Sequence, residues 1–92
     1  MNRSRLSIFY SGCVQGVGFR YTVRALATGF EVSGTIRNLS DGRVELVAEG
    51  REEELEAFRR AIQHCEVGRF IGNEHVSWHE ATGEFGGFEI VR

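Results

Sequence analysis

Residues 11–26, SGCVQGVGFRYTVRAL, combine the residue types that can bind an anion with backbone groups. Three glycines fall within seven residues, and Arg20 follows them where a helix is expected to begin. Glycine loses the most conformational freedom on folding, so such a run indicates that the backbone must approach something closely. A strand that leads through a glycine loop into a helix can turn several N–H groups toward one point, where the helix dipole also attracts negative charge. The segment therefore predicts a phosphate-like anion site.

The charges around this loop have the sign that a bound anion requires. A helix start favours acidic side chains and disfavours basic ones, yet Arg20 stands there, Arg24 follows one turn later, and residues 1–30 contain no Asp or Glu. The planar guanidinium of arginine can bind two phosphate oxygens at once. The whole chain nevertheless carries a net charge of −2. A positive region in an acidic chain indicates a local anion site, since proteins that bind polyanions usually carry an overall positive excess.

The composition is that of one ordinary globular domain, residues 1–92, with 41% hydrophobic and 26% charged residues. No apolar run approaches the ~20 residues that cross a bilayer. The N-terminus lacks the apolar segment and cleavage site of a secretory signal, so we expect a cytoplasmic protein without membrane association. Cys13 and Cys65 are expected to be reduced thiols. A monomer is the default expectation for a domain of this size.

The periodicity of apolar residues predicts strands, helices and their order along the chain. The predicted strands are 6–14, 33–38, 43–50, 74–81 and 87–92, the predicted helices are about 21–28 and 52–64, and a tight turn and a loop are predicted at 39–42 and 68–73. This βαββαβ order predicts an α+β, ferredoxin-like sandwich: a four-stranded antiparallel sheet, a short C-terminal strand, and two helices on one face. Glu45 and Glu49 alternate with core residues and are expected on a solvated face.

Two motifs in this order and spacing resemble the acylphosphatase family. The segments GCVQGVGFRY at 12–21 and GTIRNLSDGRVELVAEG at 34–50 are similar to the family's V-Q-G-V-G-F-R loop and its later G-x-V-R-N-x-x-D-G-x-V-E segment, and FEI at 88–90 is similar to its F-x-I ending. The resemblance implies a ferredoxin-like domain that hydrolyses acyl phosphates, the mixed anhydrides of carboxylic and phosphoric acids. It implies small-molecule acyl phosphates and inorganic phosphate as ligands, and neither a metal nor another cofactor.

The resemblance also implies functions for individual residues. By motif position, the phosphate-binding arginine is Arg20, and the asparagine that orients the attacking water is Asn38. The loop residues whose backbone N–H groups would bind phosphate are Gln15, Gly16, Val17, Gly18 and Phe19. Because an acyl phosphate releases a stable carboxylate, the reaction needs no general acid, which agrees with the absence of an obvious one in either motif.

The chain departs from the family pattern in three places. Cys13 stands where arginine is frequent, Thr35 stands where tryptophan is usual, and the segment after the second predicted helix lacks the common G-P turn. None of these departures removes a catalytic position. Thr35 is smaller than tryptophan, so we expect looser packing beside Asn38. This change is expected to affect the rate of turnover rather than the presence of activity.

A thiol phosphatase is an alternative, because those enzymes arrange a nucleophilic cysteine and an arginine around a phosphate loop. Their spacing is C-x5-R, whereas Cys13 and Arg20 are spaced C-x6-R, and Gly12 rather than histidine precedes the cysteine. The sequence therefore favours a small residue at the end of a strand over a nucleophile at Cys13.

A metal site is a second alternative. His75 and His79 are four residues apart, but in a strand that spacing is ~13 Å, too far for two ligands of one ion. His64 beside Cys65 at the end of the second predicted helix is interpreted as incidental. We expect no metal.

Two binding functions also compete with hydrolysis. RNA-recognition domains share the predicted strand order and stack bases on aromatic residues of their first and third strands. Here the first strand has Phe9 and Tyr10, but the third has no aromatic residue and two acids, so nucleic-acid binding is not favoured. A similar domain opens the much larger carbamoyl-transferring hydrogenase maturation proteins, but 92 residues favour a stand-alone enzyme. A non-catalytic phosphate- or anion-binding module stays open as the alternative.

Overall fold

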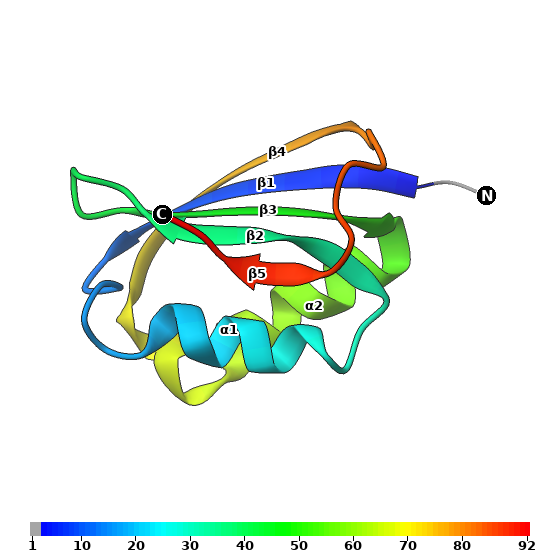
Figure 1. Ribbon diagram of the computed structural model, residues 1–92. Helices are drawn as coiled ribbons and strands as arrows, with labels where there is room; N and C mark the ends of the chain where they lie inside the picture. The colour runs from blue at the N-terminus through cyan, green and yellow to red at the C-terminus, as the bar shows by residue number, and fades with distance from the viewer. Residues whose placement is uncertain (1–2) are drawn as a thin grey trace.

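The computed structural model, which describes residues 3–92, has two layers: a five-stranded sheet, and two helices that cover one of its faces (Figure 1). The elements in chain order are β1 (Arg3–Gly12), α1 (Phe19–Ala27), β2 (Val32–Asn38), β3 (Val44–Arg51), α2 (Glu52–His64), a short 3₁₀ helix η1 (Glu66–Phe70), β4 (Ile71–Glu80) and β5 (Phe88–Ile90). This order confirms the predicted ferredoxin-like α+β sandwich.

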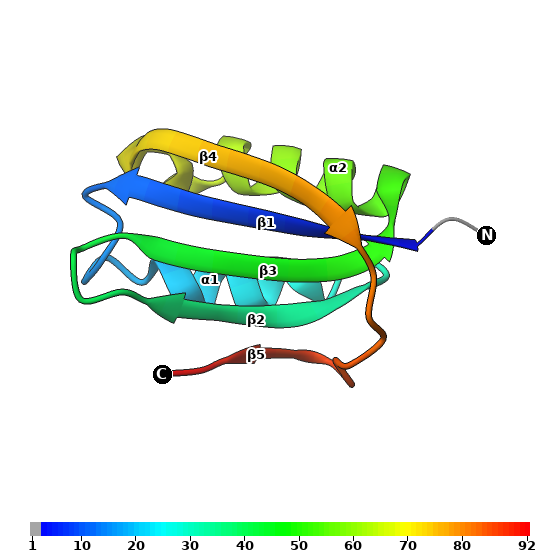
Figure 2. The same cartoon turned by 90° about the horizontal axis from the view of Figure 1, so that it is seen from above.

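The sheet has the strand order β4-β1-β3-β2-β5. Its first four strands pair in antiparallel fashion, whereas β5 lies parallel to β2, which makes the sheet mixed. Figure 2 looks onto the open face, with both helices behind the strands. Strand β3 lies between β1 and β2, so no backbone hydrogen bonds of the sheet join β1 directly to β2.

The core lies between the sheet and the helices. Alternating residues of β1 point into it, as the sequence predicts, and the buried stripe of each helix packs against them. The buried apolar side chains are Leu6, Ile8, Tyr10, Val14, Phe19, Val23, Ala27, Ile36, Val44, Leu46, Ala48, Leu55, Phe58, Ile62 and Val67. Val14 and Phe19 belong to the two ends of the glycine-rich loop, so the core holds both ends of that loop in place.

Helix α1 begins at Phe19, two residues before the predicted start. The residue before it, Gly18, has a left-handed backbone with a φ of 81°, which turns the chain into the helix. Glycine is the residue that adopts this conformation without a steric penalty. Phe19 is buried, so its ring is the first core contact of the helix.

Strand β1 ends at Gly12 rather than at residue 14, and β4 begins at Ile71, inside the predicted loop 68–73. At this end of the sheet the two backbones lie too close for a side chain, because a Cβ on Gly12 would lie 2.5 Å from the Gly72 nitrogen. The Cys13 N–H donates to the Phe70 carbonyl at 3.1 Å. These contacts fix the point at which the chain leaves the sheet and enters the loop.

The prediction that Glu49 lies on a solvated face is wrong. Its side chain is fully buried, because the connection between β4 and β5 folds over this end of β3. Its carboxylate accepts hydrogen bonds from the Arg5 Nε at 2.7 Å and from the backbone N–H groups of Thr82 and Gly83, each at 2.9 Å. Glu45 is only partly exposed and pairs with the Arg37 Nε at 2.6 Å.

Burial by itself raises the pKa of Glu49, but the hydrogen bonds from Thr82, Arg5 and Gly83 outweigh it and lower the pKa from 4.5 to about 2. A carboxyl group with a lowered pKa in the folded state stabilises the fold fully above its unfolded pKa. This stabilisation is lost as the pH falls from about 4.5 toward 2. Glu49 therefore links acid stability to the attachment of the β4–β5 connection.

We expect Glu49→Gln to lower the free energy of unfolding by about 2 kcal/mol at neutral pH, because hydrogen bonds to a buried charge are lost. The variant should also lose less stability than the parent between about pH 4.5 and pH 3. Urea denaturation at neutral pH and at about pH 3 measures both effects. Glu45→Gln, on the same face of β3, is the control and should cost less than about 1 kcal/mol. An unchanged pH dependence in Glu49→Gln would contradict the assignment.

Candidate active site

A small cavity at one end of the sheet brings together segments that are far apart in the sequence. The loop between β1 and α1 and the turn between β2 and β3 both lie at this end (Figures 1 and 2). The residues that line the cavity are Val14, Gly16, Gly18, Phe19, Arg20, Tyr21 and Asn38. Its volume of about 130 Å³ is below the ~300–1,000 Å³ of sites that enclose a drug-sized ligand. The cavity therefore suits a group the size of a phosphoryl.

The backbone of the loop is bent by two left-handed glycines, Gly16 and Gly18, with φ values of 79° and 81°. No heavy atom lies within 4 Å of a Cβ built on either residue, so it is the backbone conformation that requires glycine at both positions. Within residues 3–92, α1 has neither an acidic residue in its first turn nor a side-chain cap at Gly18. The first N–H groups of the helix are thus left for a bound anion.

Arg20 is one of the six arginines, of eleven within residues 3–92, that form no ion pair with a carboxylate. Five others, Arg5, Arg37, Arg43, Arg51 and Arg59, form ion pairs with carboxylates. Arg20 has no carboxylate within 4.0 Å among residues 3–92, and its guanidinium lies 6.0 Å from the centre of the Tyr21 ring. Its positive charge is therefore not neutralised by the protein.

Asn38 is the last residue of β2, opposite Val44 of β3. Its side-chain oxygen Oδ1 is buried and has no hydrogen-bond partner among the described residues. A buried carbonyl oxygen without a partner costs about 1–3 kcal/mol. Asn38 also lines the cavity, so its side-chain amide lies next to the space in which a phosphoryl group would bind.

The structure thus brings five of the seven predicted site residues together around one cavity: Gly16, Gly18, Phe19, Arg20 and Asn38. Val17 does not line the cavity and packs against the core instead. Gln15 does not line it either, and the sequence analysis missed what its side chain does. That side chain points to the β2–β3 turn, where its amide nitrogen contacts two backbone carbonyls. A long amide in a glycine loop was the available signal, but its partners lie more than twenty residues away.

The residues of the alternative sites lie elsewhere. Cys13 and Cys65 are free thiols, and neither lines the cavity. Among residues 3–92, no three His, Cys, Asp or Glu side chains are grouped closely enough to hold a metal ion. No helix of this part of the chain combines the length and apolar character needed to span a bilayer.

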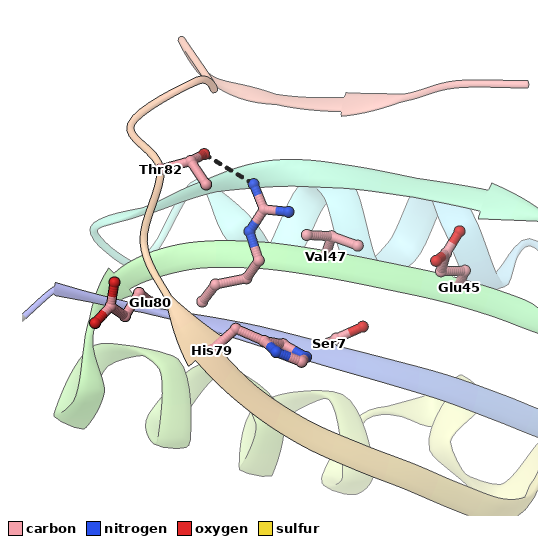
Figure 3. A pocket seen from close by; sticks show the side chains of 7 residues that line it. Ser7, Glu45, Val47, His79, Glu80 and Thr82 are labelled. Atoms are coloured by element: carbon pink, nitrogen blue, oxygen red, sulfur yellow. Dashed lines mark hydrogen bonds between the residues drawn. The ribbon is translucent and has the colours of Figure 1, made fainter.

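A second hollow, of about 380 Å³, lies on the face of the sheet that the helices leave open. Figure 3 shows it, with Ser7, Val47, His79 and Thr82 among its lining residues. Arg5 also lines it, but its guanidinium is bound by the carboxylates of Glu49 and Glu84. Because its arginine is already paired and acidic side chains line it, this hollow does not suit an anion.

Fold and cavity together define a class of protein: a ferredoxin-like α+β domain with a glycine- and arginine-lined cavity where its first strand leads into its first helix. The family model described as Acylphosphatase matches residues 6–90. An acylphosphatase of Methanospirillum hungatei JF-1 is 45% identical over 80 residues, which cover 86% of this chain and 88% of that protein. The chain belongs to the acylphosphatase family, and this membership makes it a hydrolase.

Solved structures agree with this membership. The crystal structure of acylphosphatase from Bacillus subtilis superposes with a TM-score of 0.88 at 34% identity and covers 97% of this chain and 99% of that chain. Full-length HypF, solved in a phosphate- and nucleotide-bound form, also superposes with a TM-score of 0.88, at 33% identity. That match covers 99% of this chain but 12% of HypF, so a domain of this fold also occurs as a small part of a larger protein.

We expect Gly18→Ala to damage both the fold and the anion site. An alanine at a φ of 81° is strained by about 1–2 kcal/mol, and relaxing that strain moves the helix start. Calorimetric titration with inorganic phosphate should show binding weakened by about tenfold or more, the value of one hydrogen bond to a charged group. Gly86→Ala is the control, because Gly86 has no left-handed backbone and no heavy atom lies within 4 Å of a Cβ built on it. This substitution should change neither stability nor phosphate binding. Unchanged phosphate binding in Gly18→Ala would argue against this loop as the anion site.

Proposed function

We propose that the protein hydrolyses the carboxyl–phosphate bond of small-molecule acyl phosphates, giving a carboxylate and inorganic phosphate. The observation that carries this proposal is that one cavity of phosphoryl size is lined both by Arg20, whose guanidinium has no carboxylate partner among residues 3–92, and by Asn38. Membership of the acylphosphatase family supports the same reaction. The proposal needs no metal and no other cofactor.

The phosphoryl group is bound by positive charge and by backbone donors. Arg20 binds two of its oxygens, and N–H groups of the loop from Gln15 to Phe19 bind the others. These donors stabilise the charge that the equatorial oxygens carry during in-line displacement. The acyl group lies at the mouth of the cavity, beside the 65% exposed Tyr21 ring, because the cavity has no room for it.

The attacking water is held by Asn38. Its Oδ1 accepts a hydrogen bond from the water and directs the water oxygen at phosphorus, opposite the carboxylate that leaves. An amide cannot take up a proton at neutral pH, so the water loses its proton to a phosphate oxygen of the substrate. The leaving carboxylate is stable without protonation. Consistent with this scheme, the lining residues include no Asp, Glu, His or Cys.

The first test is the hydrolysis of benzoyl phosphate in excess chelator. We expect rapid metal-free hydrolysis by the parent and a decrease in kcat of about 100-fold or more in Asn38→Ala, the scale for one essential polar group. Inhibition by inorganic phosphate should persist, because Arg20 and the loop are intact. Asn73→Ala, on the exposed part of β4, is the matched control and should retain full activity. If the parent does not hydrolyse this mixed anhydride above background, the protein is an anion-binding module instead.

The pH dependence tests the proton transfer. Because the lining residues include no Asp, Glu, His or Cys that could act as a general base, we expect kcat to change by less than about threefold between about pH 6 and pH 8. Initial rates with benzoyl phosphate, corrected for spontaneous hydrolysis at each pH, give this profile. A steep limb within that range would identify a protein base and would rule out proton transfer to the substrate.

A further inference from the structure

The side chain of Gln15 connects the two halves of the candidate site. Its Nε2 donates to the Leu39 carbonyl at 2.8 Å and to the Arg43 carbonyl at 2.9 Å. A glutamine amide has two N–H donors, and both are used here. Within residues 3–92, no other hydrogen bond joins the loop 13–18 to the turn 39–43.

The two acceptors belong to the turn that begins directly after Asn38. This turn is closed by a hydrogen bond from the Leu39 N–H to the Arg43 carbonyl at 2.8 Å and by one from the Gly42 N–H to the Leu39 carbonyl at 3.2 Å. Gln15 therefore binds the same two carbonyls that close the turn. A shift of the loop would be transmitted through this amide to the residue that follows Asn38.

No strand pairing provides an equivalent connection. The loop follows β1 and Asn38 ends β2, and these two strands are separated in the sheet by β3. The pairing of β1 and β2 with β3 sets the register of these strands. It does not fix the position of the loop, which leaves the sheet after Gly12. The Gln15 amide spans this gap directly.

We infer that Gln15 is a positioning residue, whose side-chain amide fixes Asn38 relative to the phosphate loop. This inference rests on the proposed hydrolysis, in which the loop holds phosphorus and Asn38 holds the water. In-line attack requires the water and phosphorus at a fixed separation and angle, and a misplacement of about 1 Å can cost about 100-fold in rate. Gln15 sets this separation without touching substrate through its side chain.

Gln15→Met is the first test, because methionine has a similar length and no N–H donor. We expect kcat for benzoyl phosphate to fall by about 10- to 100-fold, because the water is misplaced. The inhibition constant of inorganic phosphate should change by less than about threefold, because Arg20 and the loop N–H groups remain. Gln63→Met, which removes one amide hydrogen bond to Glu74 on the α2–β4 side, is the matched control and should keep the parental kcat.

A purely structural function of Gln15 makes a different prediction. It would weaken phosphate binding together with kcat and would act independently of Asn38. We therefore expect Gln15→Met to reduce kcat by less than about threefold when Asn38 is already alanine, because residues that act as a unit are non-additive. Independent, multiplicative effects of the two substitutions would overturn the inference, and so would a parental kcat in Gln15→Met.

Gln15→Glu gives a second test, in which the pH dependence of kcat is measured. An ionised carboxylate would face two carbonyl oxygens, which raises its pKa, whereas the protonated form can donate one hydrogen bond. We expect kcat of this variant to rise as the pH falls from about 8 to about 5, in contrast to the flat parental profile. A flat profile in the variant would overturn the inference.

If the parent lacks hydrolysis, the proposed function fails and this inference fails with it. An active parent with unaffected Gln15 variants contradicts the inference alone.

Discussion

The proposed function imposes one physical constraint on the structure: a doubly charged phosphoryl group must leave water and enter a cavity where the protein supplies the lost hydrogen bonds and opposite charge. Burying a charge without such compensation is prohibitive. The chain meets the constraint with backbone donors, which it orients through two left-handed glycines, and with Arg20, which has no carboxylate partner among residues 3–92. The helix start lacks a cap for the same reason. A helix start without a cap or an acidic residue would be unfavourable in isolation, but it suits a site that binds an anion.

The proposed hydrolysis of an acyl phosphate explains why few side chains are needed at the site. A leaving carboxylate needs no proton, and the substrate's own phosphate oxygens can accept one, so catalysis reduces to holding charge and orienting water. The two carboxylates with the most hydrogen bonds hold elements of the fold together instead. Glu49 anchors the β4–β5 connection together with Arg5, and Glu74 accepts hydrogen bonds from Arg59 and Gln63 between α2 and β4. Neither Glu49 nor Glu74 lines the cavity, so the residues that set stability at acid pH are separate from those of the proposed catalysis.

The sequence predicted those features that short-range patterns determine. Alternation at Leu6, Ile8 and Tyr10 and the helical stripes gave the order of elements, and the two motifs gave five of the seven residues that line the cavity. The same alternation failed at Glu49, because the segment that buries it is more than thirty residues away in the chain. The family resemblance predicted only a backbone N–H donor at Gln15, and it missed the side-chain contacts because their acceptors also lie in a distant segment. Local periodicity indicates on which face of a strand a residue lies, but not which distant segment covers that face.

The unpartnered oxygen of Asn38 shows how fold and site depend on each other. It costs about 1–3 kcal/mol, a substantial part of the stability of a small domain, and it persists because Asn38 is held by the ladder with β3 and by the turn that follows. A flexible strand end would rotate the amide toward the nearest donor and lose its orientation. The turn that Gln15 binds follows Asn38 directly, so the backbone is held on both sides of this residue. A backbone fixed at the end of β2 is thus what keeps this amide oxygen without a partner among the described residues.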